Sequence, residues 1–456
     1  MSNETDPDAR HARLTEWLAG KLPSASHLTL SSLTKPGLGF SNETLLGDLS
    51  WKQDGRARHE DLVFRLEPRD IRVFPEYDLA RQVRVMQCLA KTSVPVPEVL
   101  WFEEDGSVLG SPFYVMKKIA GEIPSDVPPY HASGPCVDAS PERRAEMWWS
   151  GLETLARIHM LDWQHLGLSF LGVPQSAAQS LDLQLDYYER FLGWAAAGTP
   201  QRILEAALRW LRDNRCSPAR VTLCWGDSRL PNLIFRDDRV AGVLDWEMAF
   251  LGDPEADLGW WLFLDWHHSE GNGIPRLEGF PSREETVRRY EELTGWKVES
   301  LAYYEIMAAF RFGVIMLSLA RNFTERGLTG MAEIGWNNAA TRRLASALHL
   351  PPPGQPAEGL ASAQETAVRV QFHLTGPGGG DWYVQASGGR ATRHEGTVQN
   401  PALTVTASAA DWAAIERGEL DRTLAQLRGK LMVEGDATLL TQLEDVIAGV
   451  SGPASS

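Results

Sequence analysis

The stretch WGDSRLPNLIFRDDRVAGVLDWEMAFLGDPEADLGW, residues 225–260, decides how most of this chain folds. Within it, the apolar runs LIF at 233–235 and VAGVL at 240–244 enclose the charged turn RDDR at 236–239. Short apolar runs on either side of a polar turn are typical of a β-hairpin with buried strands. The sequence therefore predicts a small hairpin at this point of the chain.

Three polar residues lie around this predicted hairpin. Asp227 and Asn232 stand five positions apart before its first strand, and Asp245 ends its second strand. Phosphoryl transfer requires a carboxylate that orients the attacking hydroxyl and oxygen ligands for the Mg²⁺ that bridges the nucleotide phosphates. Asp227 and Asn232 are also open to interpretation as turn residues, because Gly-Asp and Pro-Asn are common in turns. The position of Asp245 between apolar strands favours the phosphoryl-transfer interpretation.

The hairpin interrupts a region with helical periodicity. Apolar residues recur at spacings of three and four in the segments 145–161, 201–214 and 303–323. Upstream, residues 27–119 contain short strand-like runs separated by turn residues, with one amphipathic helix predicted at 75–90. We therefore expect a strand-rich lobe followed by a mostly helical lobe.

A proline-rich segment separates this region from the end of the chain. HLPPPGQPAEGLASAQ, residues 349–364, has the composition of a linker, and beyond it strand-like alternation is followed by helical stretches, which is typical of a separate α+β domain. We expect an N-terminal arm with a short amphipathic helix at 1–26, a strand-rich lobe at 27–119, a helical lobe at 120–348, a linker at 349–360 and a further domain at 361–456.

The composition excludes several classes of protein. The formal net charge is -16, which disfavours nucleic-acid binding and electrostatic attachment to anionic lipid. The four cysteines match no zinc spacing and are too few for a disulfide framework in 456 residues. The N-terminus lacks an apolar signal core, and no run of about 18 apolar residues occurs. We therefore expect a cytoplasmic protein without a membrane span.

The segment from 226 to 260 strongly resembles the aminoglycoside phosphotransferase and choline kinase superfamily. It is most similar to the subgroup whose kinase-like domain also precedes certain acyl-CoA dehydrogenases. GFSNET at 39–44 and VPVPEVLWFEEDGSVLGSPFYVMKKIAGE at 94–122 carry the same resemblance, which covers roughly residues 27–348. It implies an α+β, two-lobed protein-kinase-like fold.

The resemblance also implies the chemistry of the site. It implies an ATP-dependent kinase that acts on a hydroxyl group of a small molecule, with Mg²⁺ as cofactor. Asp227 would be the catalytic base or the residue that orients the substrate hydroxyl, and Asn232 and Asp245 would ligate Mg²⁺. Asp257 would hold the catalytic loop rather than touch the substrate.

KPGLGFSNET, residues 35–44, is the candidate phosphate loop. Gly37 and Gly39 permit close approach of the backbone to phosphate, and Ser41 and Asn42 add hydrogen-bond donors. A glycine pair alone is equally typical of a hairpin turn. The likeness to the family's phosphate loop favours nucleotide binding.

The strand DLVFRLE should present a cation to the α- and β-phosphates of the nucleotide. That residue is Arg65, which can donate to phosphate through two N–H groups. Its helical partner in the family is usually Glu, but the best register places Gln82 there, with Glu76 as a substitute. The identity of the partner of Arg65 stays open.

SPFYVMKKIAGE, residues 111–122, resembles the strand and hinge that join the two lobes. By that resemblance the backbone of Lys117 and Ile119 would hydrogen-bond the adenine base, and Met116 would pack beside it. Core packing of Met116 is compatible with the same role.

Several residues with reactive or aromatic side chains are better explained by structure. His159 lies in an apolar helix and is expected to be a satisfied structural histidine. His267 and His268 are expected to face the solvent, with lining of the acceptor pocket as the alternative. An aromatic cluster recurs at helical spacing, which favours core packing, although some members could line an apolar acceptor site. The cluster consists of Trp260, Trp261, Phe263 and Trp266.

The segment from about 361 to 449 resembles the sterol-carrier-protein-2-like fold, through DWYVQASGGRATRHEGTVQNPALTVTASAADWAAIERGELDRTLAQLRGKLMVEGD. That resemblance implies an apolar tunnel for a lipid or acyl ligand. An interaction module with the same fold and no ligand is the alternative.

Three functions are compatible with the sequence. The first is a kinase for a hydroxyl of a hydrophobic or hydroxyacyl-type small molecule, by analogy with the subgroup. The second is an aminoglycoside or other antibiotic phosphotransferase, which an acidic acceptor cleft would favour. The third is a nucleotide- or lipid-binding protein without catalysis, which the departures at Arg65 and Gln82 allow. The oligomeric state is open.

Overall fold

The chain forms two compact units. They comprise Met1–Trp194 with Glu205–Arg311, and Ala195–Leu204 with Phe312–Ser456. The boundary near residue 312 differs from the linker expected at 349–360, so the domain limits stay a prediction. The computed structural model describes residues 7–35, 43–69, 72–353, 368–387, 390–417, 419–420, 425 and 430–435.

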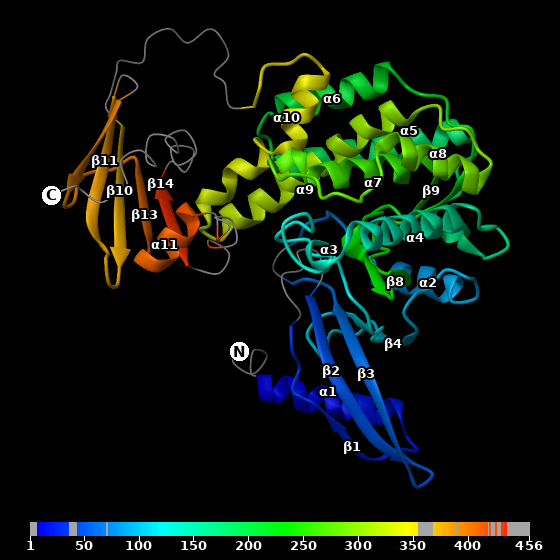
Figure 1. Ribbon diagram of the computed structural model, residues 1–456. Helices are drawn as coiled ribbons and strands as arrows, with labels where there is room; N and C mark the ends of the chain where they lie inside the picture. Colours follow the sequence, from blue (N-terminus) through cyan, green and yellow to red (C-terminus); the bar gives the residue numbers. More distant parts are fainter. Residues whose placement is uncertain are drawn as a thin grey trace. The chain divides into compact units, whose positions relative to one another are not determined.

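A five-stranded antiparallel sheet forms the expected strand-rich lobe of the first unit (Figure 1). Its strand order is β1-β2-β3-β5-β4. Alternation along β3 sends Leu62 and Phe64 to one face, and Val63 and Arg65 to the other. The strands are β1 (Ser26–Leu30), β2 (Glu43–Gln53), β3 (Arg56–Leu66), β4 (Val99–Glu103) and β5 (Phe113–Lys117).

Helix α1 (Pro7–Lys21) covers the first of these faces. Leu14 and Leu18, one turn apart, are fully buried in the cluster that contains Leu62 and Phe64. The predicted amphipathic helix is therefore present, and it packs on the sheet instead of forming a free arm. The opposite face packs against α2 (Leu79–Leu89), as the periodicity predicts.

The helical region follows the sheet. Helices α5, α6 and α9 each have residues in both units. The helices are α3 (Pro135–Asp138), α4 (Pro141–His159), α5 (Ala177–Ala196), α6 (Arg202–Asp213), α7 (Glu255–His267), α8 (Arg283–Thr294), α9 (Leu301–Glu325) and α10 (Ala339–Ala347). Short 3-10 turns lie at η1 (Leu168–Leu171), η2 (Leu230–Asn232), η3 (Glu270–Asn272) and η4 (Thr329–Gly335).

Among the described helices, α9 meets the length and composition criteria for crossing a membrane. However, 72% of its most apolar window is buried inside the protein. Core helices with this burial meet the same criteria, so the helix is weak evidence for a span. The expectation of no membrane span stays a prediction.

The predicted hairpin is present inside the helical region. Strands β7 (Leu233–Arg236) and β8 (Arg239–Val243) pair antiparallel, with Leu233 opposite Val243. Before it lies β6 (Thr222–Cys224), within the apolar run 221–225 that also predicts a buried strand, and it pairs with β9 (Phe250–Gly252), which was not predicted. All residues of β6 and β9 are buried, as are those of β7 except Arg236.

The second unit contains another five-stranded sheet, with order β12-β11-β10-β13-β14. The β10–β13 pair is parallel and the others are antiparallel. One face is apolar, and Trp412 of α11 (Ala409–Glu416) packs with Phe372 and Trp382, whose rings stack 3.9 Å apart. The strands are β10 (Val368–Thr375), β11 (Gly380–Ser387), β12 (Arg390–Glu395), β13 (Leu403–Ser408) and β14 (Leu431–Gly435).

The predicted helix at 436–449 lies outside the described residues.

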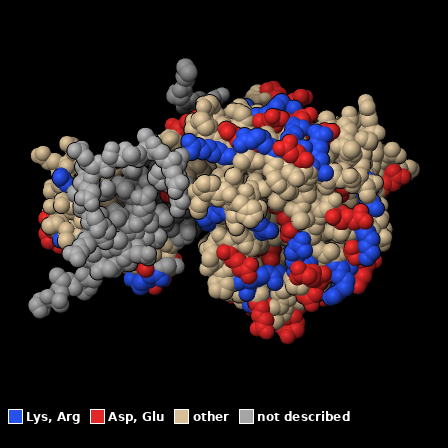
Figure 2. All heavy atoms as spheres, turned by 90° about the horizontal axis from the view of Figure 1, so that it is seen from above, with Lys and Arg blue, Asp and Glu red and all other residues tan. Residues whose placement is uncertain are grey.

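On the face drawn in Figure 2, acidic and basic side chains are interspersed. A continuous basic surface, as nucleic-acid binding requires, is not seen on that face.

Replacing Leu18 by Ala should lower the free energy of unfolding by about 2–5 kcal/mol, because the substitution leaves a cavity under the sheet. Urea denaturation measures the change. Glu16→Ala, on the exposed side of α1, is the matched control and should change stability little. Equal effects of the two substitutions would contradict the packing of α1 on the sheet.

Candidate active site

The catalytic candidates gather at the hairpin. Asp227 lies in the loop after β6, and Asn232 ends η2 just before β7. The Asn232 amide Nδ2 donates to the Asp227 backbone oxygen at 3.0 Å and to its Oδ2 at 2.6 Å. Asp245 follows β8 with a φ of 54°, a left-handed conformation that is strained for Asp and often occurs at functional sites.

Gly226 permits the chain to turn immediately before Asp227. Its φ is 89°, and a Cβ added there would lie 2.0 Å from the carbonyl oxygen of Met248. Both the backbone conformation and the close approach to residue 248 therefore require glycine. The glycine brings the loop before β7 against the loop after β8.

Asp257, in the first turn of α7, holds the backbone of this loop. Its Oδ2 accepts the N–H of Trp225 at 2.6 Å, and its Oδ1 accepts the N–H of Gly226 at 2.9 Å. The Ser228 hydroxyl donates to the Asp257 backbone oxygen at 2.7 Å. Asp257 is fully buried. The geometry agrees with the expectation that this residue holds the loop.

His159 contacts Asp257 and helps to hold its carboxylate in place. Its Nε2 lies 3.1 Å from Asp257 Oδ2, and its Nδ1 lies 2.7 Å from the hydroxyl of Tyr290. Burial raises the pKa of Tyr290 well above its ordinary value, so the hydroxyl keeps its proton and donates to Nδ1. His159 Nε2 then donates to Asp257. It is a satisfied structural histidine, as expected.

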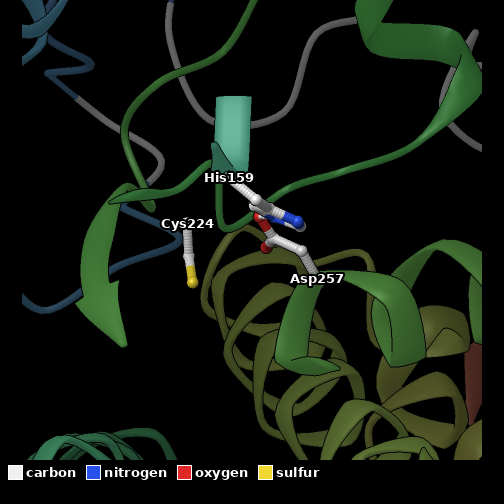
Figure 3. Close-up of side chains that lie close together, drawn as sticks. All are labelled: His159, Cys224 and Asp257. Carbon is white, nitrogen blue, oxygen red and sulfur yellow. Dashed lines mark hydrogen bonds and ion pairs between the residues drawn. The ribbon is translucent and has the colours of Figure 1, made fainter. Parts of the chain in front are cut away.

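Figure 3 shows His159, Cys224 and Asp257 side by side, with ligand atoms within 4.8 Å of one another. This group does not have the properties of a metal site. Burial raises the pKa of the Cys224 thiol well above its ordinary value, so the thiol stays protonated, and the other two side chains are used by hydrogen bonds.

The Asp227 carboxylate accepts three hydrogen bonds. Oδ2 receives the Asn232 amide and Arg229 Nε, the latter at 3.0 Å, and Oδ1 receives the indole N–H of Trp260 at 2.8 Å. Donors on both oxygens restrict the rotation of the carboxylate. Asp227 is therefore held in one orientation in the loop.

Asp126 holds the other end of Arg229. Arg229 Nη1 donates to Asp126 Oδ1 at 2.6 Å. Burial raises the pKa of Asp126, but Arg229 and His268 outweigh it and hold that pKa well below its ordinary value. Burial also lowers the pKa of Arg229, but Asp126, Asp227 and Asp245 raise it well above its ordinary value. The guanidinium is thus surrounded by carboxylates.

The expectation that His268 faces the solvent is wrong. The residue is 3% exposed at the end of α7. Its Nδ1 lies 2.8 Å from the Leu264 carbonyl oxygen, and its Nε2 lies 2.9 Å from Asp126 Oδ1. The carboxylate of Asp126 and the Leu264 carbonyl, which also accepts the backbone N–H of His268, together hold the ring inside. His267 is half-buried.

Arg65 contacts a carboxylate instead of the residue expected to anchor it. From β3 its guanidinium donates to Asp245 Oδ1 and to the Thr44 hydroxyl. Burial lowers the pKa of Arg65, but the charge of Asp245 outweighs it and raises that pKa well above its ordinary value. Gln82 is buried in α2 and makes no hydrogen bond to Arg65 in the described structure. An uncharged amide attracts the cation less than Asp245 does.

The nucleotide side is described only in part. Lys117 donates its N–H to the Glu98 carbonyl at 2.9 Å, so that N–H is not free to pair with a base. Met116 is buried in the core, as core packing predicts. The Ile119 N–H makes no hydrogen bond to any described residue. The phosphate-loop candidates lie outside the described residues: Gly37, Gly39, Ser41 and Asn42.

Four residues of the site were missed from the sequence. Asp126 and Arg229 are 103 positions apart, and no local spacing relates them. Trp260 is in the core, as predicted, and also donates to the catalytic carboxylate. Arg311, in α9, is 1% exposed and donates to the Gly226 carbonyl at 2.8 Å. Among these, the charged residue Arg311 within an apolar helical run was a detectable signal.

Comparisons with known proteins show which families the chain resembles. The sequence model of the phosphotransferase enzyme family matches residues 39–296, and that of the SCP-2 sterol transfer family matches residues 353–448. A solved structure from Ralstonia eutropha, provisionally described as an aminoglycoside phosphotransferase, superposes with a TM-score of 0.52 at 25% identity. It covers 72% of this chain and 97% of that one.

Two curated relatives are named as acyl-CoA dehydrogenase family members. Member 10 from Mus musculus is 31% identical over 296 residues, which are 61% of this chain and 25% of that protein. Member 11 from Pongo abelii is 28% identical over 277 residues, which are 57% of this chain and 34% of that protein. The chain thus spans about a quarter to a third of the length of these relatives.

Gly226→Ala should destabilise the protein by more than the roughly 1–2 kcal/mol expected from backbone strain alone, because the methyl group would overlap with the Met248 carbonyl. Gly273→Ala is the matched control, since Gly273 has a φ of 71° and no atom within 4 Å of an added Cβ. Urea denaturation of both variants measures the difference. Equal destabilisation would mean that the close approach does not constrain the loop.

Proposed function

Because the chain belongs to the phosphotransferase enzyme family, we propose that it transfers the γ-phosphoryl group of ATP to a hydroxyl group of a small molecule. The observation that carries this proposal is the fixed carboxylate of Asp227, with Asn232 in contact and Asp245 on the adjoining loop. Positioning and electrostatic stabilisation are most of what phosphoryl transfer requires of a protein.

Asp227 would orient the acceptor hydroxyl and take up its proton. The hydrogen bonds from Trp260, Arg229 and Asn232 hold the carboxylate in one orientation before the substrate arrives. Such preorganisation avoids reorganisation in the transition state. Among the described residues, Asp227 is the carboxylate that contacts Asn232 and accepts hydrogen bonds on both of its oxygens.

Asn232 and Asp245 fit the role of Mg²⁺ ligands. The Asn232 Nδ2 is used by Asp227, which leaves its Oδ1 as a ligand without a hydrogen bond to any described residue. Asp245 uses Oδ1 for Arg65, and its Oδ2 makes no hydrogen bond within the described ranges. Bound Mg²⁺ supplies charge neutralisation of the nucleotide phosphates.

On the nucleotide side, Arg65 is the cation that would contact the phosphates. The Lys117 carbonyl and the Ile119 N–H would pair with the adenine base, since neither role depends on the side chain. Gly37, Gly39, Ser41 and Asn42 complete the proposed phosphate contacts on the strength of the sequence alone.

The acceptor side favours a hydroxylated apolar or acyl-type molecule. Asp126 is compensated by Arg229 and His268, so it offers little uncompensated charge to a polycation. The same loop exposes Ile123 and Val127, at 46% and 37%. An aminoglycoside phosphotransferase is therefore the less supported candidate. A binding protein without catalysis is disfavoured by the intact set around Asp227.

A second candidate function belongs to the C-terminal part. The match to the SCP-2 sterol transfer family supports binding of a lipid or acyl ligand to this part of the chain, whose described core contains Phe372, Trp382 and Trp412. An association module without ligand is the alternative. A cytoplasmic location stays a prediction, and the oligomeric state is open.

Asp227→Asn should lower kcat about 10²–10⁴-fold, because the amide cannot take up the hydroxyl proton. ATP turnover with Mg²⁺ is measured against hydroxyacyl-CoAs, sterols, choline-like alcohols, aminoglycosides and macrolides. Asp237→Asn, on the exposed hairpin turn, should leave turnover unchanged. Unaltered turnover in Asp227→Asn would contradict the kinase assignment, and turnover with aminoglycosides alone would contradict the acceptor class.

A fluorescent fatty acyl probe should bind the full chain saturably, and Asp227→Asn should bind it equally well, because the apolar face lies far along the chain from the kinase loop. Titration followed by fluorescence anisotropy measures both affinities. A failure of wild type to bind would favour the association module.

A further inference from the structure

The two oxygens of the Asp227 carboxylate are not equivalent. Oδ2 accepts from Asn232 Nδ2 at 2.6 Å and from Arg229 Nε at 3.0 Å. An ionised carboxylate offers about two acceptor directions on each oxygen. Both directions on Oδ2 are therefore occupied, and a substrate hydroxyl has no place to donate there.

Oδ1 is different. Among the described residues its one donor is the indole N–H of Trp260, at 2.8 Å. One acceptor direction on Oδ1 remains. A hydroxyl group that donates to this carboxylate without displacing Asn232 or Arg229 must therefore do so at Oδ1, beside the indole.

Trp260 is itself held in place. The residue is 2% exposed in α7, one turn after Asp257, so both side chains lie on the same side of the helix. The Arg311 guanidinium lies 4.5 Å from the Trp260 ring and donates to the Gly226 carbonyl at 2.8 Å. One helix face thus fixes the loop backbone through Asp257 and the carboxylate through Trp260.

We infer that Trp260 is a positioning residue for phosphoryl transfer and that it makes Oδ1 of Asp227 the atom that receives the acceptor proton. The inference rests on the proposed function. The acceptor oxygen forms a bond to the γ-phosphorus of ATP while the bond from that phosphorus to the β,γ-bridging oxygen breaks and ADP leaves. The hydroxyl proton passes to Oδ1 of Asp227, and the indole keeps that oxygen directed at the hydroxyl.

The adjacent residue provides a matched control. Trp261 is equally buried, at 2%, and its indole N–H has no hydrogen-bond partner in the described parts of the chain. Phe at either position removes a similar volume from the same helix. The two substitutions differ in whether a hydrogen bond to Asp227 is lost.

Trp260→Phe should lower kcat by about 10- to 100-fold, as for the loss of a hydrogen bond to a charged group, and leave KM for ATP within about twofold of wild type. Trp261→Phe should leave both constants within about twofold. Steady-state kinetics with the acceptor found in the panel, and urea denaturation of each variant, measure the outcome. Equal kcat values for Trp260→Phe and Trp261→Phe would overturn the inference.

Replacing Trp260 by β-(3-benzothienyl)alanine keeps the ring shape and removes the N–H donor. It should reproduce the kcat loss at wild-type stability, which excludes misfolding as the cause. Wild-type kcat in this variant overturns the inference even where Trp260→Phe is unfolded. Asp227→Asn in the same assay separates the two claims: if it retains wild-type turnover, the proposed function has failed, and if it is inactive, only the role of Trp260 is in question.

Discussion

The site depends on one buried carboxylate. Asp257 accepts the N–H groups of two consecutive residues, Trp225 and Gly226, and a loop conformation without these bonds would leave the carboxylate with His159 as its remaining side-chain partner. An uncompensated buried carboxylate is costly, so the loop and α7 are bound to each other. The position of Asp257 in the first helical turn adds the favourable field of the helix dipole. Asp227 directly follows Gly226 in the chain, so the hydrogen bonds from Trp225 and Gly226 to Asp257 also fix the position of Asp227.

Arginine side chains compensate the charges of Asp227, Asp126 and Asp245. Arg229 lies between Asp227 and Asp126, and Arg65 contacts Asp245. Polar groups arranged in this way stay oriented because each has a partner, and the low dielectric of the interior strengthens the attraction. The chain is acidic overall, yet this arrangement limits the excess charge at the catalytic loop. Preorganisation, rather than a strong net field, is the contribution of these residues.

The sequence allowed the local features to be predicted and missed the distant ones. The spacing of Asp227 and Asn232 and the apolar runs of the hairpin lie within a few residues, where turn and strand patterns are informative. The partnership of Asp126 with Arg229 joins segments 103 positions apart, and periodicity carries no such information. Trp260 is the clearest example of what the sequence does not reveal. Helical periodicity predicts that its indole is buried, but it does not predict that the indole N–H donates to Asp227.

The ion pair of Arg65 with Asp245 has a consequence for the proposed reaction. Under the proposed function Arg65 would contact the phosphates and Asp245 would ligate Mg²⁺, and here the two are paired with each other. Oδ2 of Asp245 would be open to Mg²⁺, whereas the movement of Arg65 toward the phosphates would weaken the pair, so part of the binding energy would offset that loss. Gln82 makes no hydrogen bond to Arg65 in the described residues, and it is uncharged, so no anchor holds the cation away from Asp245. Because Gln82 carries no charge, it competes with Asp245 for the guanidinium less than a Glu at that position would.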